Sequence, residues 1–231
     1  MVQKPQRPML ARIHVWVLRL AMLFPAIILA GTAMPRLVSG FALAMALPVP
    51  YLIDANEHLP TTAYKAARDA LAYGSTFDGQ MKIWEAQAAY LAGSRSEDVQ
   101  PILASALDRA PSSAQGWTLL AEIEASRDPE RAASALGLAL QLAPFDYWLG
   151  PRRVSVGSGL WNVLNVEQRD SLLRQVRLLW SEPQLRAALE AAFATQQGGA
   201  LAARAFADEP DVLRELNRRV TRDKLRNFVA P

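Results

Sequence analysis

Residues that could act as acids, bases or metal ligands are few in this chain of 231 residues. There is no cysteine, which excludes a disulfide framework, a thiolate nucleophile and a cysteine-ligated metal. The two histidines are His14, at the edge of an apolar run, and His58, in "DANEHLP" with Asp54 and Glu57 close by. A single imidazole beside two carboxylates does not complete a metal site. We therefore expect no metal site, and His58 fits a turn in a linker.

The other motifs lack the partners that their chemistry needs. "VGSGLW" (156–161) contains Gly-x-Gly, but no strand precedes it and no Lys-Ser or Lys-Thr follows it, so it predicts a helix break or a loose turn rather than a phosphate site. "QQGG" (196–199) predicts the end of a helix and a linker. The carboxylates are spread along the chain, as on an ordinary charged surface. The sequence predicts no catalytic residue, no cofactor and no enzyme.

The basic residues are unevenly distributed. Five of the 25 Lys and Arg residues lie within 1–53, which contain no acid, so residues 54–231 hold 20 basic residues against 22 acidic ones. The isoelectric point of about 9.4 therefore derives from the N-terminal segment. A nucleic-acid-binding domain needs a basic face on the folded domain itself. We expect no nucleic acid as a partner.

An apolar run near the N-terminus indicates a membrane-spanning helix. Residues 14–34 contain one charge, Arg19, and match the roughly 20 residues that cross a bilayer as a helix. Basic residues precede this run, and by the positive-inside rule they place the N-terminus in the cytoplasm. We predict that residues 1–35 form a cytoplasmic tip and a transmembrane anchor, with contact to the lipid bilayer through 14–34.

A second uncharged run, residues 37–53, follows the first. Pro48 and Pro50 limit its helical part to about 11 residues, which is short for a span. We predict an apolar linker or a second short membrane-associated segment over 36–58, with the remaining domain in the periplasm. Two alternatives stay open: a hairpin that returns the domain to the cytoplasm, and a signal cleaved near "AMA" (44–46).

From residue 54 onward the apolar residues recur at helical spacing, and no segment alternates like a half-buried strand. Turns rich in Pro, Gly, Ser and Asp separate helices of roughly 15 residues. The expected helices cover residues 59–74, 77–93, 96–110, 112–126, 128–143, 167–180, 182–196 and 208–225. The predicted fold class is all-α.

A shift of 33 residues superposes two of these helix pairs. Eight residues are identical under the shift, among them Trp84 with Trp117 and Pro111 with Pro144. The others pair Ala88 with Ala121, Glu97 with Glu130, Leu103 with Leu136, Ala106 with Ala139, Leu107 with Leu140 and Ala110 with Ala143. A period near 34 residues that contains two helices is typical of a tetratricopeptide repeat.

In "WTLLA" (117–121), Ala133 and "ALQLAP" (139–144), this stretch resembles the tetratricopeptide repeat family. It departs from the family at Glu124, where a tyrosine is usual, and at Gly137, where an aromatic residue is common. The resemblance implies a solenoid of helix hairpins over 59–150. Residues 151–231 would then form degenerate repeats and a C-terminal helical cap, which a solenoid needs to close its exposed end.

Two further motifs follow the repeats: "LWNVL" (160–164) and "LLRQVRLLWSEPQL" (172–185). An anchor, repeats and these motifs, in this order, resemble accessory proteins of bacterial envelope-polysaccharide assembly and the repeat-bearing tails of O-antigen-ligase-like polymerases. The resemblance implies a non-catalytic scaffold in the bacterial inner membrane. Its partners would be membrane or periplasmic proteins of an assembly complex, with polysaccharide as a possible further ligand.

A solenoid of helix pairs binds its partners in a groove lined by the first helix of each pair. The polar and aromatic residues expected there are Lys82, Glu85, Tyr90, Gln115, Thr118, Glu122, Tyr147, Trp148, Arg152 and Arg153. Arginine and aromatic residues dominate binding hot spots, which singles out the last four. Direct binding of carbohydrate or lipid, with aromatic residues 145–148 stacking on sugar rings, is the alternative function.

Overall fold

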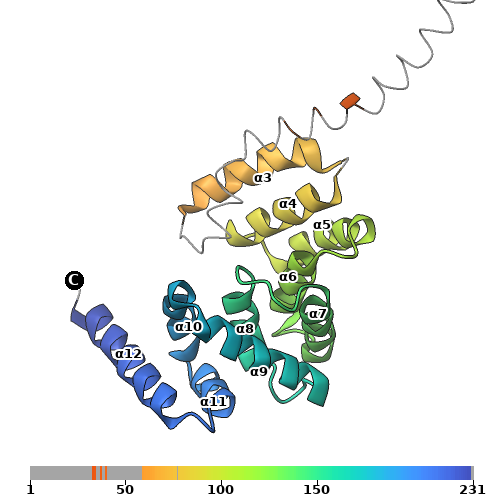
Figure 1. Ribbon diagram of the computed structural model, residues 1–231. Helices are drawn as coiled ribbons and strands as arrows, with labels where there is room; N and C mark the ends of the chain where they lie inside the picture. Colours follow the sequence, from red (N-terminus) through yellow and green to blue (C-terminus); the bar gives the residue numbers. More distant parts are fainter. Residues whose placement is uncertain (1–32, 35–36, 38–39, 41–58, 77, 230–231) are drawn as a thin grey trace, which may run out of the picture.

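The computed structural model describes residues 33–34, 37, 40, 59–76 and 78–229, and every regular element among them is helical. These elements are α3 (Thr61–Ser75), α4 (Gly79–Leu91), α5 (Ser96–Arg109), α6 (Ala114–Glu124), α7 (Pro129–Leu142), α8 (Gly150–Gly159), α9 (Val166–Ser181), the 3₁₀ helix η1 (Pro183–Leu185), α10 (Arg186–Phe193), α11 (Gln196–Ala205) and α12 (Pro210–Val229). Figure 1 shows them following one another along a curved path from α3 to α12. The all-α prediction is confirmed for this part of the chain.

Local sequence signals explain where several helices begin and end. The Asp78 carboxylate caps α4 by accepting hydrogen bonds from the backbone N–H groups of residues 80 and 81. Asn165 and Gln168 form a reciprocal capping box at the start of α9. Gly93 follows α4 with φ of 83°, a left-handed conformation that glycine adopts without steric cost.

The 33-residue shift of the sequence also holds in the structure. Helices α5 and α7 are both 14 residues long, and their bounds differ by 33 at each end. Helices α4 and α6 end 33 residues apart, at Leu91 and Glu124. The cap residues Ala110 and Ala143 have nearly the same φ/ψ, −131°/63° and −142°/73°. The array is therefore repeat-like. Below, α4, α6 and α8 are called the first helices, and α5, α7 and α9 the second helices.

The third pair departs from this register. Helix α8 begins at Gly150, which stands where Trp117 would repeat, and α9 begins at Val166 instead of 162. A Cβ atom on Gly150 would lie 2.5 Å from Cδ2 of Leu179 in α9. The missing side chain lets the start of α8 lie directly against α9, an arrangement that a tryptophan at this position would prevent.

The predictions about two glycine-rich segments have different outcomes. Residues 196–199, expected to be the end of a helix and a linker, form the first turn of α11, where the Thr195 hydroxyl accepts a hydrogen bond from the Gly198 N–H group, so this prediction is wrong. The segment 156–161, expected to be a helix break or a loose turn, contains the end of α8 at Gly159 and the turn that follows it. The helix expected over 182–196 is divided into η1 and α10.

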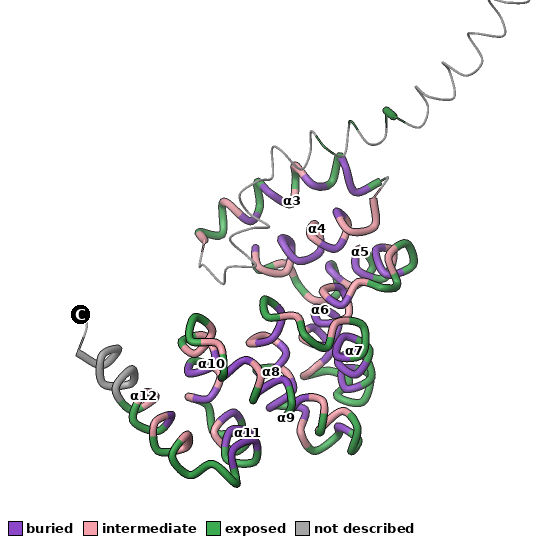
Figure 2. Tube along the Cα trace, viewed as in Figure 1, coloured by how far each residue is buried: buried purple, intermediate pink, exposed green. Residues whose placement is uncertain are grey.

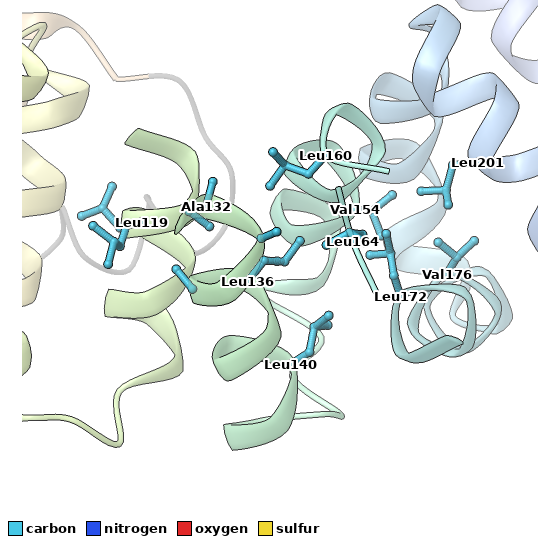
Figure 3. Packing of buried hydrophobic residues seen from close by; sticks show 14 of the residues in the cluster. Leu119, Ala132, Leu136, Leu140, Val154, Leu160, Leu164, Leu172, Val176 and Leu201 are labelled. Atoms are coloured by element: carbon cyan, nitrogen blue, oxygen red, sulfur yellow. The ribbon is translucent and has the colours of Figure 1, made fainter. Parts of the chain in front are cut away.

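Buried apolar side chains form one main cluster that runs along the array from α4 to α12. Figure 3 shows part of it, from Leu119 of α6 through Leu136 and Leu172 to Leu201 of α11. A smaller cluster joins α3 to α4. In Figure 2 the described part of the last helix, residues 210–221 of α12, is exposed or intermediate apart from Leu216, which it adds to the core. The main cluster contains residues from both sides of residue 150. The predicted repeat region and the predicted cap therefore share one core.

The predicted membrane segments lie outside the described residues, except for 33–34, 37 and 40. Among the helices that the structure describes, none combines the length and the hydropathy of a membrane span.

Candidate functional site

The first helices lie side by side and carry eight of the ten predicted binding residues (Figure 1). Lys82, Glu85 and Tyr90 belong to α4, Gln115, Thr118 and Glu122 to α6, and Arg152 and Arg153 to α8, whereas Tyr147 and Trp148 lie in the loop before α8. The 33-residue shift makes Lys82 equivalent to Gln115 and Glu85 equivalent to Thr118, and equivalent positions of successive pairs face the same way.

Three of these residues meet across three helices, and we call them the bridging cluster: Tyr90, Glu122 and Arg152. Arg152 Nε donates a hydrogen bond to Oε2 of Glu122, with which it forms an ion pair. The two side chains keep 22% and 27% of their surface exposed. Burial, followed by the nearby Glu122 carboxylate, raises the pKa of Tyr90, and the guanidinium of Arg152 opposes this shift. The cluster is thus a charged, half-buried seam.

Three polar atoms of the predicted binding residues have no hydrogen-bond partner within the described part of the chain. They are Oε2 of Glu85, Nη2 of Arg152 and Nη2 of Arg153, and all three are buried from solvent. A buried polar group without a partner costs about 1–3 kcal/mol, and more when it is charged. Because these atoms are buried, an ordered water molecule within the fold would remove this cost.

Amide side chains join α4 to α6 in a network that the sequence analysis did not predict. Oε1 of Gln115 accepts hydrogen bonds from Nε2 of Gln80 at 2.8 Å and from Nε1 of Trp84 at 3.2 Å. Nε2 of Gln115 donates to Oε1 of Gln87 at 2.5 Å. Gln80, Trp84 and Gln87 occupy positions i, i+4 and i+7 of α4, so a polar stripe at helical spacing was the available signal. Gln115 is therefore bound to its own chain.

Thr118 and Arg153 are fully buried and present no surface to a partner. Arg153 Nη1 donates to the carbonyl oxygen of Ala143 at 2.7 Å, and Nε donates to the Thr118 hydroxyl at 3.2 Å. Burial lowers the pKa of Arg153, and the nearby Asp146 carboxylate acts in the opposite direction. Arg153 therefore holds the end of α7 and the start of α8 against α6.

The loop between α7 and α8 exposes an aromatic group. Phe145 is 72% exposed and Trp148 is 66% exposed, while Tyr147 is less exposed. The Asp146 carboxylate accepts hydrogen bonds from the backbone N–H groups of Trp148 and Leu149, which fixes the turn. The structure thus presents two large apolar rings to solvent on an ordered loop.

The opposite side of the first two pairs carries a groove that the sequence analysis missed. It has a volume of about 580 Å³ and lies between α5 and α7, with α6 at its base. Leu107 and Trp117 line it, and Leu138, which is 40% exposed, stands at its edge. The Trp117 indole N–H group donates to the carbonyl oxygen of Pro111 at 2.7 Å, so the ring is held in place.

The described residues contain no group of three or more His, Asp or Glu side chains that could hold a metal ion. His14 and His58, the two histidines of the chain, lie outside these residues.

Comparisons with models of protein families, with curated proteins and with solved structures find no significant match to this chain.

Proposed function

We propose that this protein is a non-catalytic scaffold of the tetratricopeptide type that binds other proteins along its first helices. The observation that carries the proposal is the bridging cluster, in which Tyr90, Glu122 and Arg152 come from three successive first helices. Solenoids of helix pairs use this continuous surface to bind extended segments of partners. Lys82, Glu85 and the bridging cluster would make the contacts.

The partly exposed charges of Glu122 and Arg152 support a binding role over a purely structural one. A partner segment supplies backbone N–H and C=O groups that can pair with both charges. Hydrogen bonds to charged groups are worth about 1.5–3 kcal/mol each, enough to contribute measurably to affinity.

The proposed setting is the bacterial inner membrane. Residues 14–34 would anchor the chain, the N-terminus would lie in the cytoplasm, and the repeats would lie in the periplasm. The partners would then be membrane or periplasmic proteins of an envelope assembly, with polysaccharide synthesis or export as the proposed process. The support for this setting is the charge distribution of the N-terminal segment and the resemblance described above.

Fusions after Pro231 test the topology. Alkaline phosphatase activity without fluorescence from a green fluorescent protein fusion would place the repeats outside the cytoplasm. Fluorescence without phosphatase activity would instead favour the hairpin anchor, and the protein would be a cytoplasmic adaptor.

A charge reversal tests the binding surface. In Lys82→Glu a charge on α4, one of the first helices, changes sign, whereas Lys65→Glu makes the same change on the exposed side of α3. We expect cross-linked partners of the native chain to be lost in Lys82→Glu and kept in Lys65→Glu, with equal helix content by circular dichroism. Equal recovery of partners with both variants would contradict the placement.

Direct carbohydrate binding is the second candidate, favoured by the exposed rings of Phe145 and Trp148. Aromatic side chains offer flat apolar faces on which a sugar ring can stack. A polysaccharide titration followed by intrinsic tryptophan fluorescence separates the two functions. A saturable change that Trp148→Ala abolishes would support carbohydrate binding, and the absence of any saturable change would favour the scaffold.

A further inference from the structure

A second polar surface lies away from the first-helix face, where the α8–α9 loop meets the end of α11. Two arginines approach the ring of Trp161: Cζ of Arg204 lies 4.9 Å from the ring centroid, and Cζ of Arg169 lies 5.4 Å from it. Both distances fall within the range of cation–π contacts. One indole ring thus positions two guanidinium groups that come from α9 and α11.

The hydrogen bonds of these arginines leave donors free. Arg169 uses Nε and Nη2 to bind the carbonyl oxygens of Trp161 and Asn162, at 3.0 and 3.2 Å. Arg204 is exposed and its side chain makes no hydrogen bond within the described residues, so all of its guanidinium N–H groups remain available. Arg177, whose Nε donates to the carbonyl oxygen of Ala205 at 2.7 Å, brings a third guanidinium to the end of α11.

No carboxylate of the described residues pairs with these three arginines. Arg152 pairs with Glu122, and Arg219 pairs with Glu190 and Glu215. Exposed acids lie close in sequence, at Glu167 and Asp170 of α9 and at Asp208 after α11, yet none of the three pairs with Arg169, Arg177 or Arg204 in the described structure. The guanidinium groups are therefore free to bind an external anion.

We propose that Trp161, Arg169 and Arg204 form a docking surface for an acidic segment of a partner protein. The proposal rests on the scaffold function, and it adds a second contact of defined chemistry. Tryptophan and arginine are the residue types most enriched at the energetic centres of protein interfaces. A guanidinium fork binds a carboxylate through two parallel hydrogen bonds, which makes Asp and Glu side chains the matching groups.

Apolar neighbours favour a polypeptide over an acidic sugar polymer or a lipid headgroup. Val163 is 43% exposed and Val166 is 70% exposed, and both lie between Trp161 and Arg169 in the sequence. Exposed aliphatic side chains close to Arg169 in the sequence match a segment in which carboxylates alternate with apolar residues. An acidic polysaccharide would use the charges and leave the valines uncovered.

A peptide-binding experiment on the full chain in a non-ionic detergent tests the proposal. The probe is a fluorescein-labelled peptide of Asp, Glu and Leu, compared with a peptide in which Asn and Gln replace the acids. We expect anisotropy to report saturable binding of the acidic peptide alone, weakened by added salt. Arg204→Glu should weaken binding at least about tenfold, whereas Arg127→Glu, the same change at an exposed arginine before α7, should change it less than about twofold.

The Arg204 side chain makes no hydrogen bond in the described structure, and circular dichroism checks that its reversal leaves the helices intact. Equal binding of the two peptides, or equal effects of the two substitutions, would overturn the proposal. Tighter binding of polygalacturonate than of the acidic peptide, again dependent on Arg204, would overturn the polypeptide assignment. None of these results bears on the Lys82→Glu test, so the docking surface and the scaffold function can fail separately.

Discussion

Arg152 of α8 forms an ion pair with Glu122 of α6, and this contact spans the point at which the 33-residue register is lost. Both side chains are partly exposed, and such pairs contribute on the order of 1 kcal/mol or less. The contribution of the pair to stability is therefore small. Its role is positional, because it fixes α8 beside α6. It thereby completes the surface that begins at Tyr90 of α4.

Tyr90 should give the folded protein a measurable pH dependence in the alkaline range. Its pKa is raised above the ordinary value of 10.0, so the folded chain holds this proton more tightly than the unfolded chain does. The resulting stability is fully present below the unfolded pKa and is lost as pH rises through the folded pKa. Urea unfolding from about pH 8 to about pH 11 should show this decline in the native chain and a smaller one in Tyr90→Phe. Identical slopes in the two proteins would contradict the prediction.

Removing Arg153 should destabilise the fold more than removing an exposed arginine. Arg153→Ala leaves the carbonyl oxygen of Ala143 without its donor and opens a cavity between α6 and α8. We expect a loss of about 2–4 kcal/mol in the free energy of unfolding. Arg127→Ala, at an exposed position, should stay within about 0.5 kcal/mol. Chemical denaturation monitored by circular dichroism measures both, and equal losses would show that Arg153 is not a structural residue.

The helix pairs could be predicted because the repeated residues are the ones that pack. Leu103 and Leu136 are both fully buried, as are Ala106 and Ala139, so a sequence period reflects a period of contacts. The first turn of α11 could not be predicted from its glycines. A Cβ on Gly198 would lie 2.1 Å from the carbonyl oxygen of Ala192, so glycine is required there by the fit to the preceding helix, which residue type alone does not reveal.

The sequence predicted which helices carry most of the candidate residues, and it predicted the surroundings of these residues only in part. The 33-residue shift placed Lys82 and Gln115 on equivalent faces, and the structure places both on first helices. Residue type indicated a surface role for Arg153. In the structure its side chain is fully buried and donates a hydrogen bond to the carbonyl oxygen of Ala143 at the end of α7. The Trp161 surface has no local signature either, because Arg169 and Arg204 are 35 residues apart and only packing brings them to one ring.

The repeat makes a paired prediction for two leucines. Leu103 of α5 and Leu136 of α7 occupy equivalent positions and are both 0% exposed. Truncation to alanine at either position should cost about 2–5 kcal/mol, because each change leaves a cavity in the main core. Leu138→Ala, on α7 at a position that is 40% exposed, should cost clearly less. Thermal and urea unfolding of the three variants measures the order. A small loss at only one of the two buried leucines would mean that the pairs are not equivalent.

Alanine substitutions at two glycines of α8 distinguish the effect of helix propensity on stability from the effect of packing. Alanine favours a helix over glycine by about 1 kcal/mol, which by itself would stabilise both Gly157→Ala and Gly159→Ala. A Cβ on Gly157 would lie 2.6 Å from Cδ2 of Leu172, a fully buried residue of α9, whereas a Cβ on Gly159 meets nothing within 4 Å. Forcing extra volume into a packed interface costs about 1–3 kcal/mol.

We therefore expect Gly159→Ala to leave the melting temperature unchanged or raised, and Gly157→Ala to lower it. Because the two positions share a helix and differ by two residues, an effect on α8 alone would move both variants in the same direction. Opposite shifts would locate the cost at the contact between α8 and α9. A rise in both would mean that Leu172 can move aside, and that this contact is looser than the close approach of Gly157 to Leu172 implies.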